Sequence, residues 1–143
     1  MSIGSLSVNT NDSLLITNKD NSENIKYIDN NLVYRPWGYY INIDGSNSNY
    51  KVKKICVYPN KKLSLQSHKF RSEHWVIING SAKIQIGKDF LFLNRNQNIF
   101  IPKETLHRVE NIGSDLLEII ETQIGDYLGE DDIIRYDDDF GRI

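Results

Sequence analysis

Potential metal ligands are concentrated between Gln66 and Glu73, and one more lies at His107. Gln66, His68 and Glu73 supply a carboxamide oxygen, an imidazole and a carboxylate. With the second imidazole of His107, these groups suit a borderline or hard divalent cation such as Zn²⁺, Mn²⁺, Fe²⁺ or Co²⁺. No cysteine belongs to the set, which favours an open site with Lewis acidity over a closed structural zinc site. Each residue alone also fits a structural role, as a satisfied polar group or a strand-edge charge.

The spacing of these residues predicts which of them share a face. A β-strand sends alternate side chains to the same side, so Gln66 and His68 are neighbours if their segment is extended. Glu73 returns to that side after a bend at residues 69–72. His74 follows Glu73 directly and therefore faces the other way, where it packs or supports the site from outside.

The elements that must position these residues are short β-type segments. Strand-like runs recur about every 8–12 residues with turn signals such as Asp44-Gly45 and Asn79-Gly80 between them, which is typical of an all-β sandwich or barrel. The segment 116–124 contains isoleucines and a threonine, which favour a strand over a helix. A short helix or strand is expected around 133–134. The expected strands are 37–44, 50–58, 63–66, 75–78, 82–86, 90–93, 99–101 and 116–124.

Length and composition indicate one domain, and the single cysteine, Cys56, fits a reducing compartment. The 143 residues suffice for one core. Residues 1–24 are rich in Ser, Asn, Thr and Asp and are expected to form a flexible or partner-packing extension, and residues 25–143 the domain. A net charge of −2 and a pI near 5.9 argue against nucleic-acid binding. No apolar run approaches the ~20 residues that span a membrane, and no secretory signal is recognisable, so we expect a cytoplasmic location. Cys56 lies in an apolar run and is expected in the core.

Two separated motifs resemble a known superfamily. Residues 59–80 are similar to the first motif of the cupins, and residues 98–111 to the second. The flanks at 35–38 and 127–142 agree as well. More narrowly, residues 34–142 resemble the C-terminal cupin domain of type II phosphomannose isomerases, which is often fused to mannose-1-phosphate guanylyltransferase. The resemblance implies a single cupin jelly-roll barrel that holds a metal ion near its axis.

The chain departs from that family in two ways. Phe70 occupies a place where the family usually has a histidine, which puts substrate handling in question more than metal binding. The spacing of these residues fits the general cupin pattern if glutamine takes the first ligand position. We therefore keep Gln66, His68, Glu73 and His107 as the expected ligands. No glycine-rich nucleotide loop is present, so pyrophosphorylase activity is not expected from this chain.

The resemblance implies a metal-dependent aldose–ketose isomerase that interconverts mannose 6-phosphate and fructose 6-phosphate for nucleotide-sugar and polysaccharide precursor synthesis. Zinc is the first expectation for the metal, with Mn, Co or Fe as alternatives. Arg108, beside His107, and Arg71, in the ligand loop, are the expected partners of the phosphate or enediolate, unless they form surface salt bridges. Glu110 is a candidate for proton transfer, and Lys53 is an alternative.

Two other functions stay open. An isomerase or epimerase of nucleotide-linked sugars often uses a histidine as acid or base, but only three histidines exist and two are expected to bind the metal. A cupin that binds a sugar phosphate without turnover is favoured by Phe70 and by the freestanding domain. By analogy with other jelly-roll cupins, we expect a homodimer.

Overall fold

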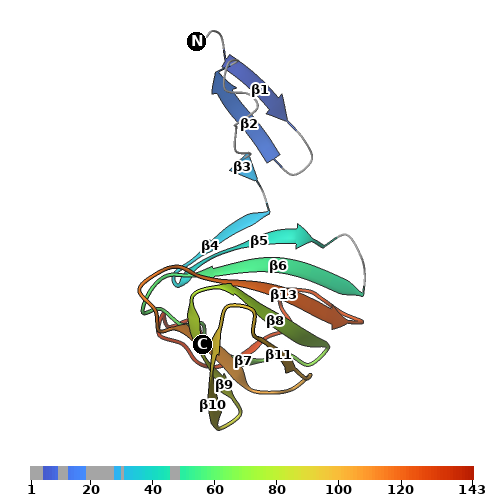
Figure 1. The fold of residues 1–143 in the computed structure, drawn as a ribbon. Coiled ribbons are helices and arrows are strands. Elements are labelled where there is room, and N and C mark those ends of the chain that lie inside the picture. The colour runs from blue at the N-terminus through green and yellow to red at the C-terminus, as the bar shows by residue number, and fades with distance from the viewer. Residues whose placement is uncertain (1–4, 10–12, 19–27, 30, 46–48) are drawn as a thin grey trace. The chain divides into compact units, whose positions relative to one another are not determined.

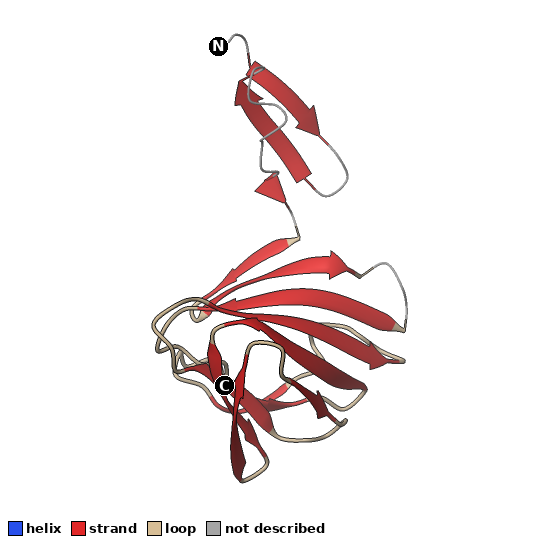
Figure 2. Cartoon of the chain, in the orientation of Figure 1, coloured by secondary structure: helices blue, strands red, loops and turns tan. Residues whose placement is uncertain are grey.

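The structure, a computed structural model, describes residues 5–9, 13–18, 28–29, 31–45 and 49–143. The chain divides into two compact units, residues 1–33 and 34–143, and each is described by itself (Figure 1). Every regular element in the described ranges is a strand, as Figure 2 shows. The domain boundary predicted after residue 24 falls within 19–27, outside the described residues, and stays a prediction.

The first unit contains a small antiparallel sheet in the order β1-β2-β3. Its strands are β1 (Ser5–Asn9), β2 (Ser13–Asn18) and β3 (Ile28–Asp29). The register of β1 with β2 runs from Ser5 opposite Asn18 to Asn9 opposite Leu14. The expectation that residues 1–24 form a flexible or partner-packing extension stays a prediction. The β-branched residues Val8 in β1 and Ile16 and Thr17 in β2 favour strands in both segments.

The larger of the two sheets around the core has six strands in the order β11-β8-β13-β6-β5-β4. Each neighbouring pair from β11 to β5 is antiparallel. The strands are β4 (Leu32–Arg35), β5 (Gly38–Asp44), β6 (Tyr50–Val57), β8 (Arg71–Asn79), β11 (Asn98–Ile101) and β13 (Leu117–Gly125).

The facing sheet has five strands in the order β10-β9-β12-β7-β14. Its strands are β7 (Leu65–Ser67), β9 (Ser81–Ile86), β10 (Asp89–Asn94), β12 (His107–Asn111) and β14 (Ile134–Asp137). Most expected strands are present within a few residues of their predicted bounds, and the ambiguous segment at 133–134 leads into strand β14. The fold prediction of an all-β jelly-roll barrel is confirmed.

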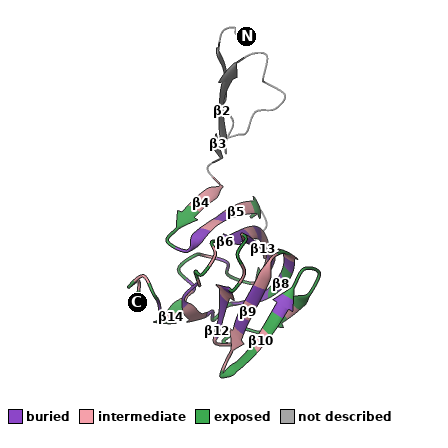
Figure 3. Cartoon of the chain, turned by 60° about the vertical axis from the view of Figure 1, so that its left-hand side comes forward, coloured by how far each residue is buried: buried purple, intermediate pink, exposed green. Residues whose placement is uncertain are grey.

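The barrel interior has an apolar end and a polar end, and both are visible along β8. Its side chains alternate, so Arg71, Glu73, Trp75 and Ile77 are buried while His74 is exposed (Figure 3). Strand β13 runs antiparallel beside β8 and repeats the pattern. Its inward residues are apolar at the start and polar at the end: Leu117, Ile119, Glu121 and Gln123 are all buried. The antiparallel register brings the polar ends of both strands together.

Two smaller predictions also have an outcome. Cys56 is fully buried and is a free thiol, which confirms its place in the core. Among the described residues there is no helix with the length and apolar character needed to cross a membrane.

Candidate metal centre and the adjoining cavity

The predicted ligands come from three strands and one loop and meet at the polar end of the barrel. Gln66 lies on β7, and His107 on β12 pairs with it across the five-stranded sheet. His68 follows β7 in the chain, and Glu73 lies on β8 of the other sheet. The cluster therefore joins the two sheets across the interior. His107, which is far from the other ligands in sequence, reaches them because β12 pairs with β7.

His68, Glu73 and His107 form a compact buried group. Their potential ligand atoms all lie within 4.8 Å of one another. One carboxylate oxygen of Glu73 is 3.0 Å from His68 Nε2, and the other is 3.5 Å from His107 Nε2. The exposed fractions of the three residues are only 1–3%. Two imidazoles and one carboxylate in this arrangement match an open divalent-metal site.

Both imidazoles are oriented by main-chain carbonyls. His68 Nδ1 is 2.7 Å from the carbonyl oxygen of Asp132, and His107 Nδ1 is 2.8 Å from that of Thr105. A carbonyl only accepts hydrogen bonds, so each Nδ1 carries the proton and donates. In the neutral rings, this leaves the Nε2 lone pairs facing the cluster. His107 Nε2 is buried and has no hydrogen-bond partner within the described part of the chain. These donors fit a divalent ion.

Gln66 is beside the cluster, with its amide nitrogen rather than its oxygen towards the centre. Its Nε2 is 3.3 Å from His68 Nε2, and its Oε1 accepts a hydrogen bond of 2.7 Å from Ser64 Oγ. The two ends of an amide are assigned from such partners. Ligation through the Gln66 oxygen would require the amide to turn over.

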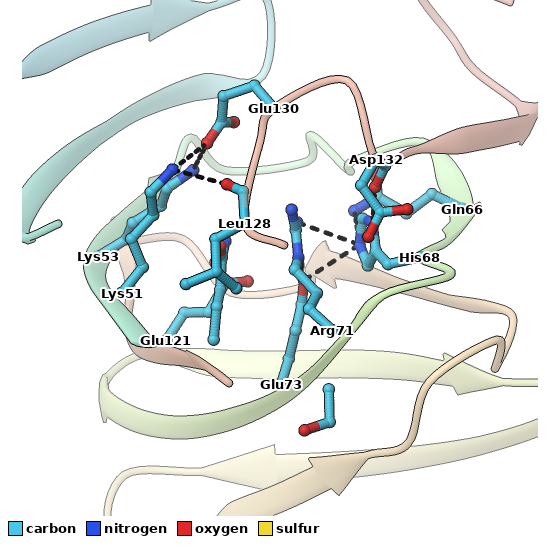
Figure 4. Close-up of polar contacts among 12 residues, drawn as sticks. Lys51, Lys53, Gln66, His68, Arg71, Glu73, Glu121, Leu128, Glu130 and Asp132 are labelled. Carbon is cyan, nitrogen blue, oxygen red and sulfur yellow. Dashed lines mark hydrogen bonds and ion pairs between the residues drawn. The ribbon is translucent and has the colours of Figure 1, made fainter. Parts of the chain in front are cut away.

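Arg71 lies at the junction of the cluster and a neighbouring cavity. Its Nε and Nη2 both lie 3.0 Å from Glu73 Oε1, and Nη2 is 3.3 Å from His68 Nε2 (Figure 4). Burial lowers the pKa of Arg71, but the neighbouring carboxylates, Glu73 first and then Glu121, together outweigh burial and raise it. The guanidinium therefore stays charged, and its positive charge lies next to Glu73 Oε1 and His68 Nε2.

A second buried carboxylate is connected to the cluster through an indole. Trp75 Nε1 lies 3.0 Å from Glu73 Oε2 and 2.9 Å from Glu121 Oε2, so one donor is shared between two carboxylates. On its other side, Glu121 accepts a hydrogen bond of 2.6 Å from Gln123 Nε2. This chain of polar groups runs along β8 and β13 from the cluster into the cavity.

The two carboxylates have opposite pKa shifts. Burial raises the pKa of Glu73, but the neighbouring imidazoles of His107 and His68 outweigh it and hold the pKa well below 4.5. Burial, followed by the charge of Glu73, raises the pKa of Glu121 from 4.5 to about 7. For His107, burial lowers the pKa, but the nearby Glu73 carboxylate outweighs it and the net change is upward. The site thus holds one ionised carboxylate beside one that titrates near neutrality.

The adjoining cavity is lined mainly by cations, aromatic rings and the polar groups just described. Arg71, Gln66, Glu121 and Gln123 belong to its wall. The remaining lining residues are Arg35, Trp37, Tyr40, Lys53, Ile55, Leu63, Ser64, Glu130, Ile133, Arg135 and Arg142. A cavity with several cations next to a metal-ligand cluster suits a small anionic ligand.

The loop between β13 and β14 is tied to the barrel by two lysines of β6. Lys51 Nζ donates to the carbonyl of Leu128 at 2.8 Å. The ammonium of Lys53, which is 3% exposed, lies 2.7 Å from Glu130 Oε2 and 4.2 Å from the ring centroid of Tyr40. Burial raises the pKa of Glu130, but Lys53 outweighs it and the net change is downward. This loop therefore forms one side of the cavity.

Asp132 connects the same loop to the metal ligands. Its carbonyl orients His68, and its carboxylate accepts hydrogen bonds from the main-chain N–H groups of Lys69 at 2.9 Å and Phe70 at 3.0 Å (Figure 4). One buried residue thus fixes both the imidazole and the bend that follows it. Sequence reasoning missed Asp132, because a main-chain contact between residues so far apart leaves no signal in residue types.

The structure does not bring Arg108 and Glu110 to the cluster. Both lie on the face of β12 opposite His107, and Arg108 donates to the carbonyl of Leu63 at 2.8 Å and to the Asp137 carboxylate at 3.0 Å. They line a separate surface pocket. The prediction of catalytic roles for these two residues is corrected here, because side chains alternate along β12 and theirs point away from the site.

The outward orientation predicted for His74 is confirmed, and Phe70 also lies outside the cluster. The His74 ring is exposed, with its centroid 4.6 Å from that of Phe100. Phe70 is 44% exposed and packs edge-on against Tyr127, with ring centroids 5.9 Å apart. The side chain that replaces the family histidine therefore does not displace a ligand from the His68, Glu73 and His107 group.

The two-sheet antiparallel barrel, with a buried cluster of two histidines and a carboxylate inside it, defines the second unit as a cupin. A solved structure of oxalate decarboxylase from Bacillus subtilis shares this fold, with a TM-score of 0.66 and 15% identity over 73% of this chain and 29% of that chain. The sequence matches the family "Mannose-6-phosphate isomerase C-terminal" over residues 8–138, and the chain belongs to this family.

Curated relatives agree with this membership. The chain is 40% identical to the xanthan biosynthesis protein XanB of Xanthomonas campestris pv. campestris, over 94% of this chain and 32% of that protein. It is 38% identical to mannose-1-phosphate guanylyltransferase of Escherichia coli, over 95% of this chain and 31% of that protein. The chain therefore spans about a third of the length of these relatives.

Proposed function

We propose that the chain is a metal-dependent aldose–ketose isomerase that interconverts mannose 6-phosphate and fructose 6-phosphate and so supplies precursors of nucleotide sugars and polysaccharides. Family membership supports the reaction, and the names of the relatives support a place in mannose and polysaccharide metabolism. Zinc is the proposed ion, with Mn, Co or Fe as alternatives, because two imidazoles and a carboxylate suit zinc well.

One observation carries the metal proposal. His107 Nε2 is buried and makes no hydrogen bond to any described residue, although its Nδ1 is held by a carbonyl. A buried polar atom without a partner is unfavourable by roughly 1–3 kcal/mol, so its retention calls for a ligand. His68 Nε2 and Glu73 converge on the same space. A divalent cation satisfies all three donors at once.

The cavity side chains suit the remaining demands of the reaction. A bound divalent ion would polarise the sugar oxygens and stabilise the oxyanion of an enediolate. The charged Arg71 guanidinium, between the ion's ligands and the cavity, would add to that stabilisation. Arg135 and Arg35 line the cavity, and Arg135 Nε is buried without a hydrogen-bond partner within the described ranges, so these two are proposed to bind the phosphate.

Glu121 is the proposed group that moves the proton between C1 and C2 of the sugar. The cavity contains two carboxylates, Glu121 and Glu130. Glu130 is paired with Lys53 at 2.7 Å, whereas the hydrogen bonds to Glu121 come from the uncharged Trp75 and Gln123. A carboxylate without a cationic partner is the better proton acceptor. Glu121 thus replaces Glu110 in this role.

The test is proton exchange at C2 of mannose 6-phosphate in D₂O, followed by NMR. The metal-free full chain is loaded with Zn²⁺, Mn²⁺ or Co²⁺ in turn. We expect exchange with at least one ion and its loss in His107→Ala. His74→Ala is the matched control, because the same substitution on the outward face leaves the cluster intact. Bound metal without exchange for every ion would refute the isomerase.

A second candidate function is a cupin that binds a sugar phosphate without turnover. The observation in its favour is that Arg71 already donates to Glu73 and approaches His68 Nε2. An internal cation can satisfy these two groups without a metal. In that case mannose 6-phosphate binds equally well to metal-free and metal-loaded protein, and no exchange at C2 occurs.

A further inference from the structure

Gln123 is a buried polar residue at the wall of the cavity. It lies on β13 directly opposite Glu73 of β8, and its exposed fraction is 0%. Its side chain shares the inward face of β13 with Glu121 and lines the cavity together with Arg71 and Gln66. The residue therefore adjoins the candidate metal centre without belonging to its ligands.

One end of the Gln123 amide has no partner. Its Nε2 donates to Glu121 Oε1 at 2.6 Å, while its Oε1 is buried and makes no hydrogen bond to any described residue. Turning the amide over would place the oxygen towards Glu121 and leave the nitrogen open instead. In either orientation one polar atom of this cavity-lining side chain has no hydrogen-bond partner among the described residues, and such an atom requires an explanation.

We propose that the Gln123 amide binds a hydroxyl group of a polyhydroxylated ligand beside the metal centre and so determines which sugar is accepted. A hydroxyl both donates and accepts, so it satisfies the open atom in either amide orientation. This inference deepens the proposed function, on which it rests, by assigning a specificity-determining residue to the sugar. A site built to bind a hydroxyl discriminates against analogues that lack it, because its buried polar group is then left unpaired.

The positive charge of the cavity lining indicates that the ligand also carries an anionic group. Arg135 Nε is the second buried atom of the cavity lining without a partner in the described residues, and it is a donor. Together, an open amide and an open guanidinium nitrogen complement a molecule that carries both hydroxyl groups and an anionic group. Sugar phosphates combine these two features, whereas an apolar ligand or a simple dicarboxylate provides no hydroxyl.

The test compares Gln123→Met with the unaltered full chain by isothermal titration. Methionine has a similar length and removes both polar atoms. The probes are mannose 6-phosphate, its monodeoxy analogues and neutral mannose, each with metal-loaded protein. We expect the variant to bind mannose 6-phosphate roughly five- to tenfold more weakly, the effect of one lost hydrogen bond. For the analogue that lacks the contacted hydroxyl, variant and unaltered protein should bind equally. Gln85→Met, on the outer face, is the control and should change nothing.

Several outcomes would overturn the inference. A loss of the same size for every probe, deoxy analogues included, would mean that Gln123 acts only through the shape of the site. Unchanged binding of every probe, or the absence of binding of any hydroxyl-bearing probe to the unaltered chain, would overturn it as well. Gln123→Asn, which withdraws the amide but keeps its polarity, repeats the comparison if the methionine variant does not fold. Hydroxyl-dependent binding without exchange at C2 would refute the isomerase and leave the role of Gln123 intact.

Discussion

The pH dependence of stability tests the unusual environment of Glu121. Burial and the neighbouring Glu73 charge raise its pKa from 4.5 to about 7 in the folded protein. The folded state therefore holds more protons than the unfolded chain between these values, and the free energy of unfolding falls as the pH rises through that window. At 1.36 kcal/mol for each pKa unit, the contribution of Glu121 lost by pH 7.5 is about 3 kcal/mol.

Other groups at the site do not reverse this expectation. The pKa of Glu73 is lowered, so its contribution is fully present above 4.5 and is lost only as the pH falls further. The pKa of His107 is raised above 6.5, so its contribution also declines as the pH rises. Glu121→Gln removes the charge of one residue and keeps its shape, so the difference between variant and unaltered protein isolates Glu121.

The assay is urea unfolding of metal-free protein at a series of pH values from about 4.5 to 7.5. Over this pH range, the free energy of unfolding of Glu121→Gln should fall by about 3 kcal/mol less than that of the unaltered protein. Glu104→Gln, at an exposed position, is the control and should behave like the unaltered protein. Equal pH dependence of Glu121→Gln and the unaltered protein, or stability that rises towards pH 7.5, would refute the assignment of a raised pKa to Glu121.

Three further predictions concern the groups that hold the site. Asp132→Ala keeps the carbonyl that contacts His68 but removes the carboxylate that holds the main-chain N–H groups of Lys69 and Phe70. It should weaken zinc binding roughly 10- to 100-fold by titration calorimetry, because outer partners of metal ligands typically contribute that much; unchanged affinity would exclude a role of this carboxylate in positioning His68. Trp75→Phe should lower the free energy of unfolding by about 2–4 kcal/mol, because it removes the donor shared by two buried carboxylates and leaves a space; a loss below about 0.5 kcal/mol, the range of neutral surface changes, would contradict this. Gly125→Ala should cost about 1–3 kcal/mol in urea unfolding, because its Cβ would collide with the Phe70 carbonyl oxygen; a neutral result would contradict the close approach.

Alternation and turn chemistry predicted most of the barrel and the centre of the site. The spacing of Gln66 and His68, with the return at Glu73, placed three residues together before any strand pairing was known. The same rule excluded His74. The same alternation along β12 also excludes Arg108, which follows His107 directly. The prediction of a catalytic role for Arg108 was therefore wrong because it relied on proximity to His107 in sequence.

The remaining site residues depend on pairings that the sequence does not reveal. Glu121 and Gln123 read as polar positions in an apolar strand, and only the register of β13 with β8 shows that their side chains join Glu73 inside the barrel. The available sequence signal was that Glu121 and Gln123 fall on the same face of the strand as the apolar Ile119. Asp132 acts partly through its carbonyl oxygen, and a main-chain contact of this kind carries no preference for residue type.

Cytoplasmic location and a homodimer stay predictions for this chain. The flexible nature of residues 1–24 and their packing against a partner are likewise untested. Size-exclusion chromatography coupled to light scattering would settle the oligomeric state; a mass of one chain, 16.6 kDa, would contradict the dimer.

Metal stoichiometry is the most direct measurement of the central claim. The purified full chain, stripped with chelator and dialysed against Zn²⁺, is analysed for bound metal by mass spectrometry. A metal centre formed by His68, Glu73 and His107 predicts one ion per chain, loss of the ion in Glu73→Gln and His107→Ala, and retention in His74→Ala. An absence of bound metal in the unaltered chain, or an ion that persists in both ligand variants, would contradict the account.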